Sequence, residues 1–546
     1  MGLRDILIFT ALALAYRLIF RQRGRAWFLL VSSALAIYWL QPLAPIRYMD
    51  FWLPTATLGL VVLTWVITTP PEGRDWRANG PAAAVLAGVV LLVGTTRFLS
   101  QDGLLTAGRP PAFAQVALGL IVIAGLGWLL SLQFKPPGTY PKNKETTFLY
   151  PKNRRFFGYK KVDPSDFSDR YLRVFKTLRV LEVSISIVLL LALLVVLKLP
   201  ALAQLASAGL RALMGQEASL ATATDLRWLG FSYVAFRLIS TLRERQNGRL
   251  PLVTLQEYVI YVIFFPAYTA GPIDRLDRFI KDLRVGWVSQ PTKANTGSPT
   301  AGNQPGVGLV SQPTRTAGDP KDYLAAGERL VLGLFKKFVL ADGLALVALN
   351  AGNAAQVNSA GWAWVLLYAY SLQIFFDFSG YTDIAIGLGR LLGIVLPENF
   401  NAPYLKPNLT QFWNNWHMTL TQWFRAYYFN PFTRWLRTGG RKLSAAAIIF
   451  VTQITTFVLI GLWHGITWNF VLWGAWHGLG LFVQNRYSEW VRPHLPDLSA
   501  RPALKQGLAV FGGLLTFHYV ALGWVWFALP SAGLSWQVFL KLFGVR

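Results

Sequence analysis

Long apolar runs, each about as long as a bilayer's hydrocarbon core is thick, dominate the N-terminal part of this chain. A helix needs roughly 20 residues to cross that core. Suitable runs occupy residues 6–20, 27–46, 51–69, 81–99, 112–134 and 180–203. Backbone polar groups inside a bilayer must be satisfied internally, so a spanning chain folds into helices or a closed barrel. At this length the runs predict helices.

The composition excludes a soluble globule. Of 546 residues, 53% are hydrophobic and only 14% are charged, which leaves too little polar surface to cover a soluble protein of this size. We therefore predict an all-α, polytopic transmembrane bundle of about 11–13 spans, located in the cell membrane.

The basic residues set the expected orientation. The loop after the first run is basic, the next carries only Arg47, and residues 135–179 are strongly basic. Because positive loops stay in the cytoplasm, the N-terminus is expected outside and 135–179 inside. Two readings of this loop stay open: a solvated loop against lipid headgroups, or a docking face for an acidic carrier protein. The net charge of +26 is explained by such basic loops between the apolar runs. No nucleic-acid partner is expected, because the sequence shows no RNA- or DNA-binding motif.

The whole chain, 1–546, is expected to form one membrane domain. Helices occupy 1–134, the basic loop follows at 135–179, and a core of helices covers 225–485. A segment rich in Gln, Thr, Gly and Pro at 289–320 interrupts that core and is predicted to be flexible. A C-terminal helical region spans 505–546.

The candidate chemistry lies in three of the five histidines: His417, His464 and His477 fall in one tryptophan-rich stretch. Imidazole titrates near neutral pH, and an ionisable group at membrane depth is by default a hypothesis about function. An interhelical hydrogen bond is the alternative for each of them. The chain has no cysteine, which excludes thiolate chemistry. Metal catalysis is disfavoured because the histidines lack tight ligand spacing.

A second polar group interrupts the apolar run 362–397. It contains Asp377, Asp383 and Arg390, and several prolines follow before Trp413. Irregular backbone at membrane depth is tolerated only where protein or a wet cavity surrounds it, so we expect a cavity here. The three charges form either a buried structural network or part of a functional site.

Several motifs together resemble the bacterial membrane-bound O-acyltransferases. They are FFPAYTAGPIDR at 264–275, GLFKK at 333–337, FFDFSGYTD at 375–383, ENFNAPY at 398–404, WNNWH at 413–417 and GLWHG at 461–465. The resemblance covers about residues 229–484. It extends to two branches, one that exports D-alanyl groups onto teichoic acids and one that O-acetylates polysaccharides.

The resemblance implies broken or re-entrant helices around a central tunnel. An acyl group, acetyl or D-alanyl, would pass from a cytoplasmic thioester to a hydroxyl of an extracytoplasmic polysaccharide, teichoic acid or glycolipid. The thioester, on carrier-protein phosphopantetheine or as acetyl-CoA, is a substrate, and no cofactor is expected to stay bound. The expected partners are this donor with its acyl carrier protein, the hydroxyl acceptor and membrane lipids.

The family's invariant histidine corresponds to His464, which is expected to act as the general base. His417 corresponds to the second histidine and is expected to position the acceptor or relay a proton. The residues expected to bind substrate are Asn414, Asn415, Trp416, Trp463, Asp377, Arg425 and His477. Lys336 and Lys337 are expected either to pair with a donor phosphate or to anchor at the interface. Ala426 follows Arg425 where the family commonly has an acidic residue.

Two further classes of function remain open. In a proton-coupled transporter or flippase, His464 and Asp377 would form a proton path through broken helices. In a non-catalytic scaffold of an export complex, His464 would be replaceable without loss.

Overall fold

The structure is a computed structural model that describes residues 2–19, 24–99, 104–132, 164–285, 320–440, 443–494 and 501–545. All regular structure in these ranges is helical, which confirms the predicted all-α class. Six of the described helices are long and apolar enough to cross a bilayer. The chain is therefore a multi-pass membrane protein.

The N-terminal helices match the apolar runs closely. They are α1 (Leu3–Ile19), α2 (Arg25–Leu40), α3 (Met49–Thr68), α4 (Trp76–Thr95) and α5 (Phe113–Leu132). In the apolar windows of α3 and α5, 67% and 6% of the residues are buried. Helix α3 is therefore internal to the bundle, whereas α5 presents most of its surface outward.

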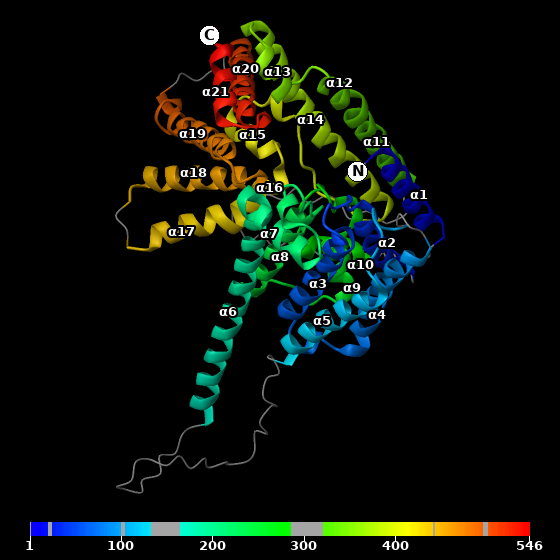
Figure 1. The fold of residues 1–546 in the computed structure, drawn as a ribbon. Coiled ribbons are helices and arrows are strands. Elements are labelled where there is room, and N and C mark those ends of the chain that lie inside the picture. The colour runs from blue at the N-terminus through cyan, green and yellow to red at the C-terminus, as the bar shows by residue number, and fades with distance from the viewer. Residues whose placement is uncertain are drawn as a thin grey trace.

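The apolar run predicted at 180–203 is split between two helices in the structure. Helix α6 (Pro164–Lys198) is continuous, and α7 (Pro200–Leu213) starts anew at a proline, which cannot continue the hydrogen-bonding of the preceding helix. Since α6 begins at Pro164, the end of the segment expected as a basic loop is helical. Its N-terminal part stands away from the bundle (Figure 1). Residues 135–163 and 289–319 lie outside the described residues, and so does the predicted flexibility of the latter.

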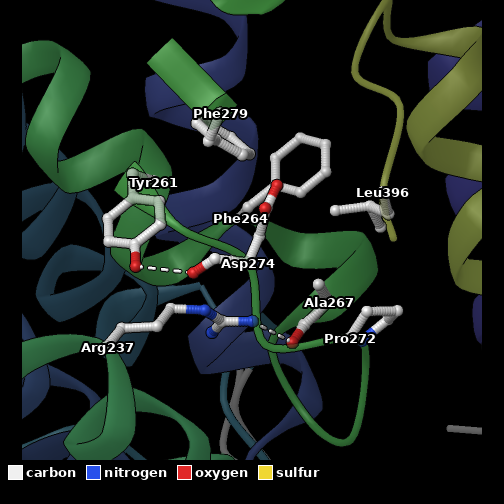
Figure 2. A pocket seen from close by; sticks show the side chains of 8 residues that line it. All are labelled: Arg237, Tyr261, Phe264, Ala267, Pro272, Asp274, Phe279 and Leu396. Atoms are coloured by element: carbon white, nitrogen blue, oxygen red, sulfur yellow. Dashed lines mark hydrogen bonds between the residues drawn. The ribbon is translucent and has the colours of Figure 1, made fainter. Parts of the chain in front are cut away.

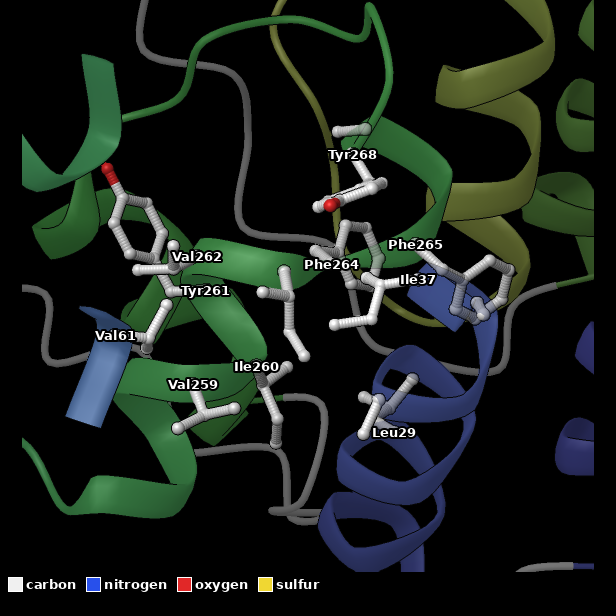
Figure 3. Close-up of a cluster of buried hydrophobic side chains, with 14 of the residues drawn as sticks. Leu29, Ile37, Val61, Val259, Ile260, Tyr261, Val262, Phe264, Phe265 and Tyr268 are labelled. Carbon is white, nitrogen blue, oxygen red and sulfur yellow. The ribbon is translucent and has the colours of Figure 1, made fainter. Parts of the chain in front are cut away.

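A cluster of buried side chains joins the N-terminal helices to the rest of the bundle. It is formed by α2, α3, α8 (Phe231–Gln246), α9 (Leu255–Ile263) and the turn after α9. Figure 3 shows Leu29 and Ile37 of α2 facing residues of α9 and Phe265. Helix α10 (Leu276–Val285) also contributes side chains to this cluster.

The other half begins with α11 (Pro320–Leu334), the π-helix η6 (Phe335–Ala341), α12 (Asp342–Ala345), α13 (Ala351–Gln356) and α14 (Ala360–Leu391). Helix α14 is unbroken although it carries Asp377 and Asp383. Gly333 and Gly380 let α11 and α14 touch: a Cβ on Gly333 would lie 2.7 Å from the Gly380 oxygen. The irregular backbone expected in this region starts only after Leu391.

The remaining helices surround the histidine motifs. They are α15 (Leu409–Asn415), α16 (Met418–Phe424), the π-helix η8 (Arg425–Phe429), α17 (Asn430–Thr438), α18 (Ala445–His464), α19 (Trp468–Trp490), α20 (Pro502–Ala528) and α21 (Ala532–Leu542). Short 3-10 turns connect other elements: η2 (Pro71–Gly73), η3 (Thr96–Phe98), η4 (Ala218–Leu220), η5 (Phe265–Ala267), η7 (Pro403–Leu405) and η9 (Arg492–His494). Helices α17, α18 and α19 lie together on one side of the molecule (Figure 1).

Candidate active site

His464 is the last residue of α18, at the tip of a tight hairpin with α19. Glycines make the close crossing possible. A Cβ on Gly461 would lie 2.1 Å from the Phe470 oxygen, and one on Gly474 would lie 2.4 Å from the Phe457 oxygen. Helix α19 begins at Trp468, three residues after the GLWHG motif ends at Gly465.

Aromatic rings surround the His464 imidazole. The ring centroids of Trp463, Phe527 and Trp473 lie 4.6, 4.8 and 5.8 Å from it. The side chain is only half-buried, and among the described residues neither ring nitrogen makes a hydrogen bond. The imidazole is thus enclosed by apolar rings while its nitrogens stay free to bind a substrate group.

His417 occupies a strained backbone position between α15 and α16, with φ of 41°. The side chain is buried. Its Nδ1 lies 3.4 Å from Oδ1 of Asn399. The same oxygen accepts hydrogen bonds from the backbone N–H and the hydroxyl of Thr419, at 3.2 and 2.6 Å. An amide N–H is always a donor, so this atom of Asn399 is the oxygen.

The Asn399 contact fixes the His417 tautomer. Since the oxygen of Asn399 accepts, Nδ1 of His417 carries the proton, and Nε2 presents a lone pair. That Nε2 is buried and has no hydrogen-bond partner in the described part of the chain. A buried polar atom without a partner is uncommon in folded proteins, which favours a substrate atom as its partner.

Trp463 lies between the two histidines. Its ring centroid is 6.4 Å from that of His417 and 4.6 Å from that of His464. Its own Nε1 is buried and unpaired among the described residues. Phe378 of α14 also makes an edge contact with His417, with ring centroids 4.6 Å apart. The two histidines and the indole therefore share one aromatic-walled centre.

Lys198, the last residue of α6, also belongs to this centre and was not predicted. Its Nζ lies 5.9 Å from the centre of the Trp463 ring, and its backbone oxygen accepts from Ile466 just after His464, at 3.3 Å. One signal was available in the sequence: a lysine inside the apolar run 180–203 is costly unless it has a role.

His477 is separated from this centre by the Trp473 ring. It is fully buried, and Trp413 and Trp473 each make an edge contact with it at 5.0 Å. Trp473 also contacts His464, so one indole separates the two imidazoles. Neither ring nitrogen of His477 has a hydrogen-bond partner among residues the structure describes.

The candidates Asn414 and Asn415 of α15, and Trp416 directly after it, contact other groups of the protein. Asn414 is exposed, and its Oδ1 accepts from Arg425 at 2.8 Å. The side chain of Asn415 donates to the Gln411 oxygen at 2.7 Å. Trp416 is buried among aromatic rings, including Phe400 at 5.1 Å and Trp524 at 5.2 Å. Neither asparagine side chain contacts a histidine.

Asp377 belongs to a separate charge network. It pairs with Lys337 of η6, and its side chain is 51% exposed. Asp383 pairs with Lys336 at 2.6 Å and also with Arg329, which in turn pairs with Glu398. These pairs join α11 and η6 to α14. Both lysines are thereby engaged with carboxylates of the protein itself.

The FFPAYTAGPIDR motif forms a buried turn held by Arg237 of α8. The guanidinium donates to the backbone oxygens of Ala267 and Val262, at 2.7 and 3.1 Å. The Tyr261 hydroxyl donates to the Asp274 backbone oxygen at 2.9 Å. Figure 2 shows Arg237, Tyr261, Ala267 and Asp274 among the residues that line a small pocket at this turn. All of these contacts stay within the protein, so the motif shapes the scaffold.

A metal centre finds no support in the described ranges, where no group of three or more histidines, cysteines or carboxylates is placed to hold an ion. The fold and the site define a multi-pass membrane protein with a histidine and tryptophan centre at a helix-hairpin tip. The family model of the membrane-bound O-acyltransferases matches residues 178–525. The chain belongs to this family and is an acyltransferase.

Relatives from both branches are similar to this chain. A teichoic acid D-alanyltransferase of Bacillus subtilis is 27% identical over 56% of this chain and 69% of its own length. A probable alginate O-acetylase of Pseudomonas aeruginosa is 31% identical over 58% of this chain and 51% of its own. A peptidoglycan O-acetyltransferase of Helicobacter pylori is 35% identical over 56% and 52%. The chain thus spans about half the length of these two O-acetylating relatives.

Proposed function

We propose that this chain transfers an acyl group from a cytoplasmic thioester to a hydroxyl of an extracytoplasmic polymer or glycolipid, with His464 as general base. The main support is that three groups without a hydrogen-bond partner among the described residues meet at one centre: the His464 imidazole, Nε2 of His417 and Nε1 of Trp463. The last two atoms are buried, and because buried polar atoms are normally paired, the proposal assigns substrate atoms as their partners.

The chemistry follows from these groups. The acceptor hydroxyl attacks the thioester carbonyl, His464 takes its proton, and the departing thiolate receives a proton in turn. A positioned base contributes roughly 10²- to 10⁴-fold to such a step. The indole N–H of Trp463 is a donor for the oxygen that becomes negative in the tetrahedral intermediate. The aromatic wall keeps water from the thioester.

Nε2 of His417 is an acceptor in the tautomer that Asn399 imposes. It therefore suits orientation of the acceptor hydroxyl or relay of its proton. The names of the relatives give acetyl and D-alanyl as acyl groups. The thioester source in this proposal is an acyl carrier protein or coenzyme A. Among the rival functions, a proton path through Asp377 is weakened because that carboxylate pairs with Lys337.

The test is mass spectrometry of envelope esters in cells that express the chain with its genomic neighbours. Wild type is compared with His464→Ala and His417→Ala at equal membrane levels of protein. His494→Ala is the matched control, because this histidine is exposed and bonded to the Trp490 oxygen. We expect the ester to be lost with His464→Ala and retained with the control. An ester that persists without His464 would favour a scaffold.

A further inference from the structure

Lys198 places a positive charge at the reaction centre. Its ammonium lies 5.9 Å from the Trp463 ring centre, and that ring lies 4.6 Å from the His464 ring. By the sum of these two steps, the ammonium is within about 11 Å of the imidazole, a range over which charges interact strongly in a poorly hydrated site.

No carboxylate compensates this charge in the described part of the chain. The acidic residues of α14, by contrast, are paired with Arg329, Lys336 or Lys337. The Lys198 side chain is half-buried, and its ammonium lies over the Trp463 ring. Salt screens a partly buried charge less than an exposed one. The centre therefore carries a net positive potential when Lys198 is protonated.

The acyl group must sit close to that potential. For His464 to accept the proton of the attacking hydroxyl, the thioester carbonyl must lie next to the hydroxyl and hence near the imidazole. The α-carbon of the acyl group is bonded directly to this carbonyl. An acetyl group brings no charge there, whereas a D-alanyl group brings an α-ammonium that is mostly protonated near pH 7.

We propose that Lys198 selects an uncharged acyl group, so that this site transfers acetyl in preference to D-alanyl. The inference rests on the proposed function, since it assumes that His464 is the base. The step is ordinary transesterification: the bond between the acyl carbon and sulfur breaks, the ester bond to the acceptor oxygen forms, and the hydroxyl proton passes through His464 to the thiolate.

The test compares two isotopically labelled donors, the acetyl and the D-alanyl thioesters of phosphopantetheine. They are added at equal concentration to permeabilised membranes that contain the chain and the cell envelope of its host. Label in envelope esters is counted for wild type, K198R, K198M and K198E. We expect wild type and K198R to favour acetyl at least tenfold, and K198E to lower the acetyl to D-alanyl ratio by at least tenfold. K198M should fall between them.

Two controls separate the possible failures. Lys505→Met removes an exposed lysine at the start of α20 and should leave the ratio unchanged. His464→Ala should abolish transfer of both groups. If transfer requires His464 but the ratio is equal in wild type and K198E, or if wild type prefers D-alanyl, the selection by Lys198 is refuted. If label enters esters equally without His464, the proposed function itself fails.

Discussion

The backbone oxygen of Phe470 lies 2.1 Å from the point that a Cβ on Gly461 would occupy. Two helices cross at this contact, and His464 follows one turn later on α18. Because the obstacle is backbone, an added methyl group cannot be accommodated by a side-chain rotation.

Gly461→Ala is therefore expected to push α18 and α19 apart and displace His464. Overpacking of this kind lowers the free energy of unfolding by about 1–3 kcal/mol. The rate of acyl transfer per folded molecule should also fall, because the crossing sets the position of the base. Melting of the detergent-solubilised protein and ester formation measure the two effects. Gly209→Ala in α7 is the control, since a Cβ there meets nothing within 4 Å. Equal activity of Gly461→Ala and wild type would contradict the role of the crossing.

Asn399→Ala is expected to reduce acyl transfer without unfolding the protein. The change removes the oxygen that faces Nδ1 of His417 and accepts two hydrogen bonds from Thr419. Each donor left unpaired and buried costs about 1–3 kcal/mol, and His417 loses the contact that fixes its tautomer.

Rates of ester formation at several acceptor concentrations check the Asn399 prediction, with Asn247→Ala as a control that removes an exposed amide at the end of α8. Acceptor KM should rise in Asn399→Ala and stay constant in Asn247→Ala. The prediction fails if both variants match wild type.

The spans and the two main histidines were accessible from the sequence because their signals are local. Apolar runs of bilayer length predict helices directly, and GLWHG and WNNWH each lie within one short segment. The break between α6 and α7 was missed, because the run 180–203 was predicted as one span although Pro200 cannot continue a helix. The contacts between side chains were not accessible in this way. Asp377, predicted to bind substrate, pairs with Lys337, and its role in binding stays a prediction.

The contacts of Lys198 and Asn399 were not accessible from the sequence. Lys198 precedes His464 by 266 residues (464 − 198), and only the tertiary packing of α6 against the hairpin brings them together. The contact of Asn399 with His417 depends on a left-handed backbone turn at His417 itself. The periodicity of the sequence predicts neither the packing of Lys198 near His464 nor the contact of Asn399 with His417.

Arg237→Met should destabilise the scaffold and leave the chemistry of the folded fraction unchanged. The buried guanidinium satisfies the backbone oxygens of Val262 and Ala267, and each lost hydrogen bond to a buried group costs about 1–3 kcal/mol. Yield of monodisperse protein after extraction reports the stability, and ester formed per folded molecule reports the chemistry. Arg243→Met removes an arginine bonded at its surface to Gln246 and should behave as wild type. A normal yield of Arg237→Met would show that the two hydrogen bonds of Arg237 are not needed for stability.

Asp225 provides a pH-dependent contribution to stability outside the predicted spans. Burial raises the pKa of this carboxyl, but hydrogen bonds from Ser207, Thr222 and Arg211 outweigh burial and hold the pKa well below its usual range. A carboxyl whose pKa is lower in the folded state stabilises the protein above its unfolded pKa, near 4 for Asp. That stabilisation is lost as the pH falls toward the folded pKa.

Asp225→Asn is therefore expected to melt below wild type at pH 7, by an amount that stays constant down to about pH 5. Below that the difference should shrink, because wild type alone loses the contribution of the ionised carboxylate. Thermal melts of the detergent-solubilised proteins between pH 7 and pH 3 measure it. Asp75→Asn, which alters the exposed N-cap of α4, controls for general effects of acid. A gap between Asp225→Asn and wild type that grows on acidification would show that the carboxylate is not held ionised by its partners.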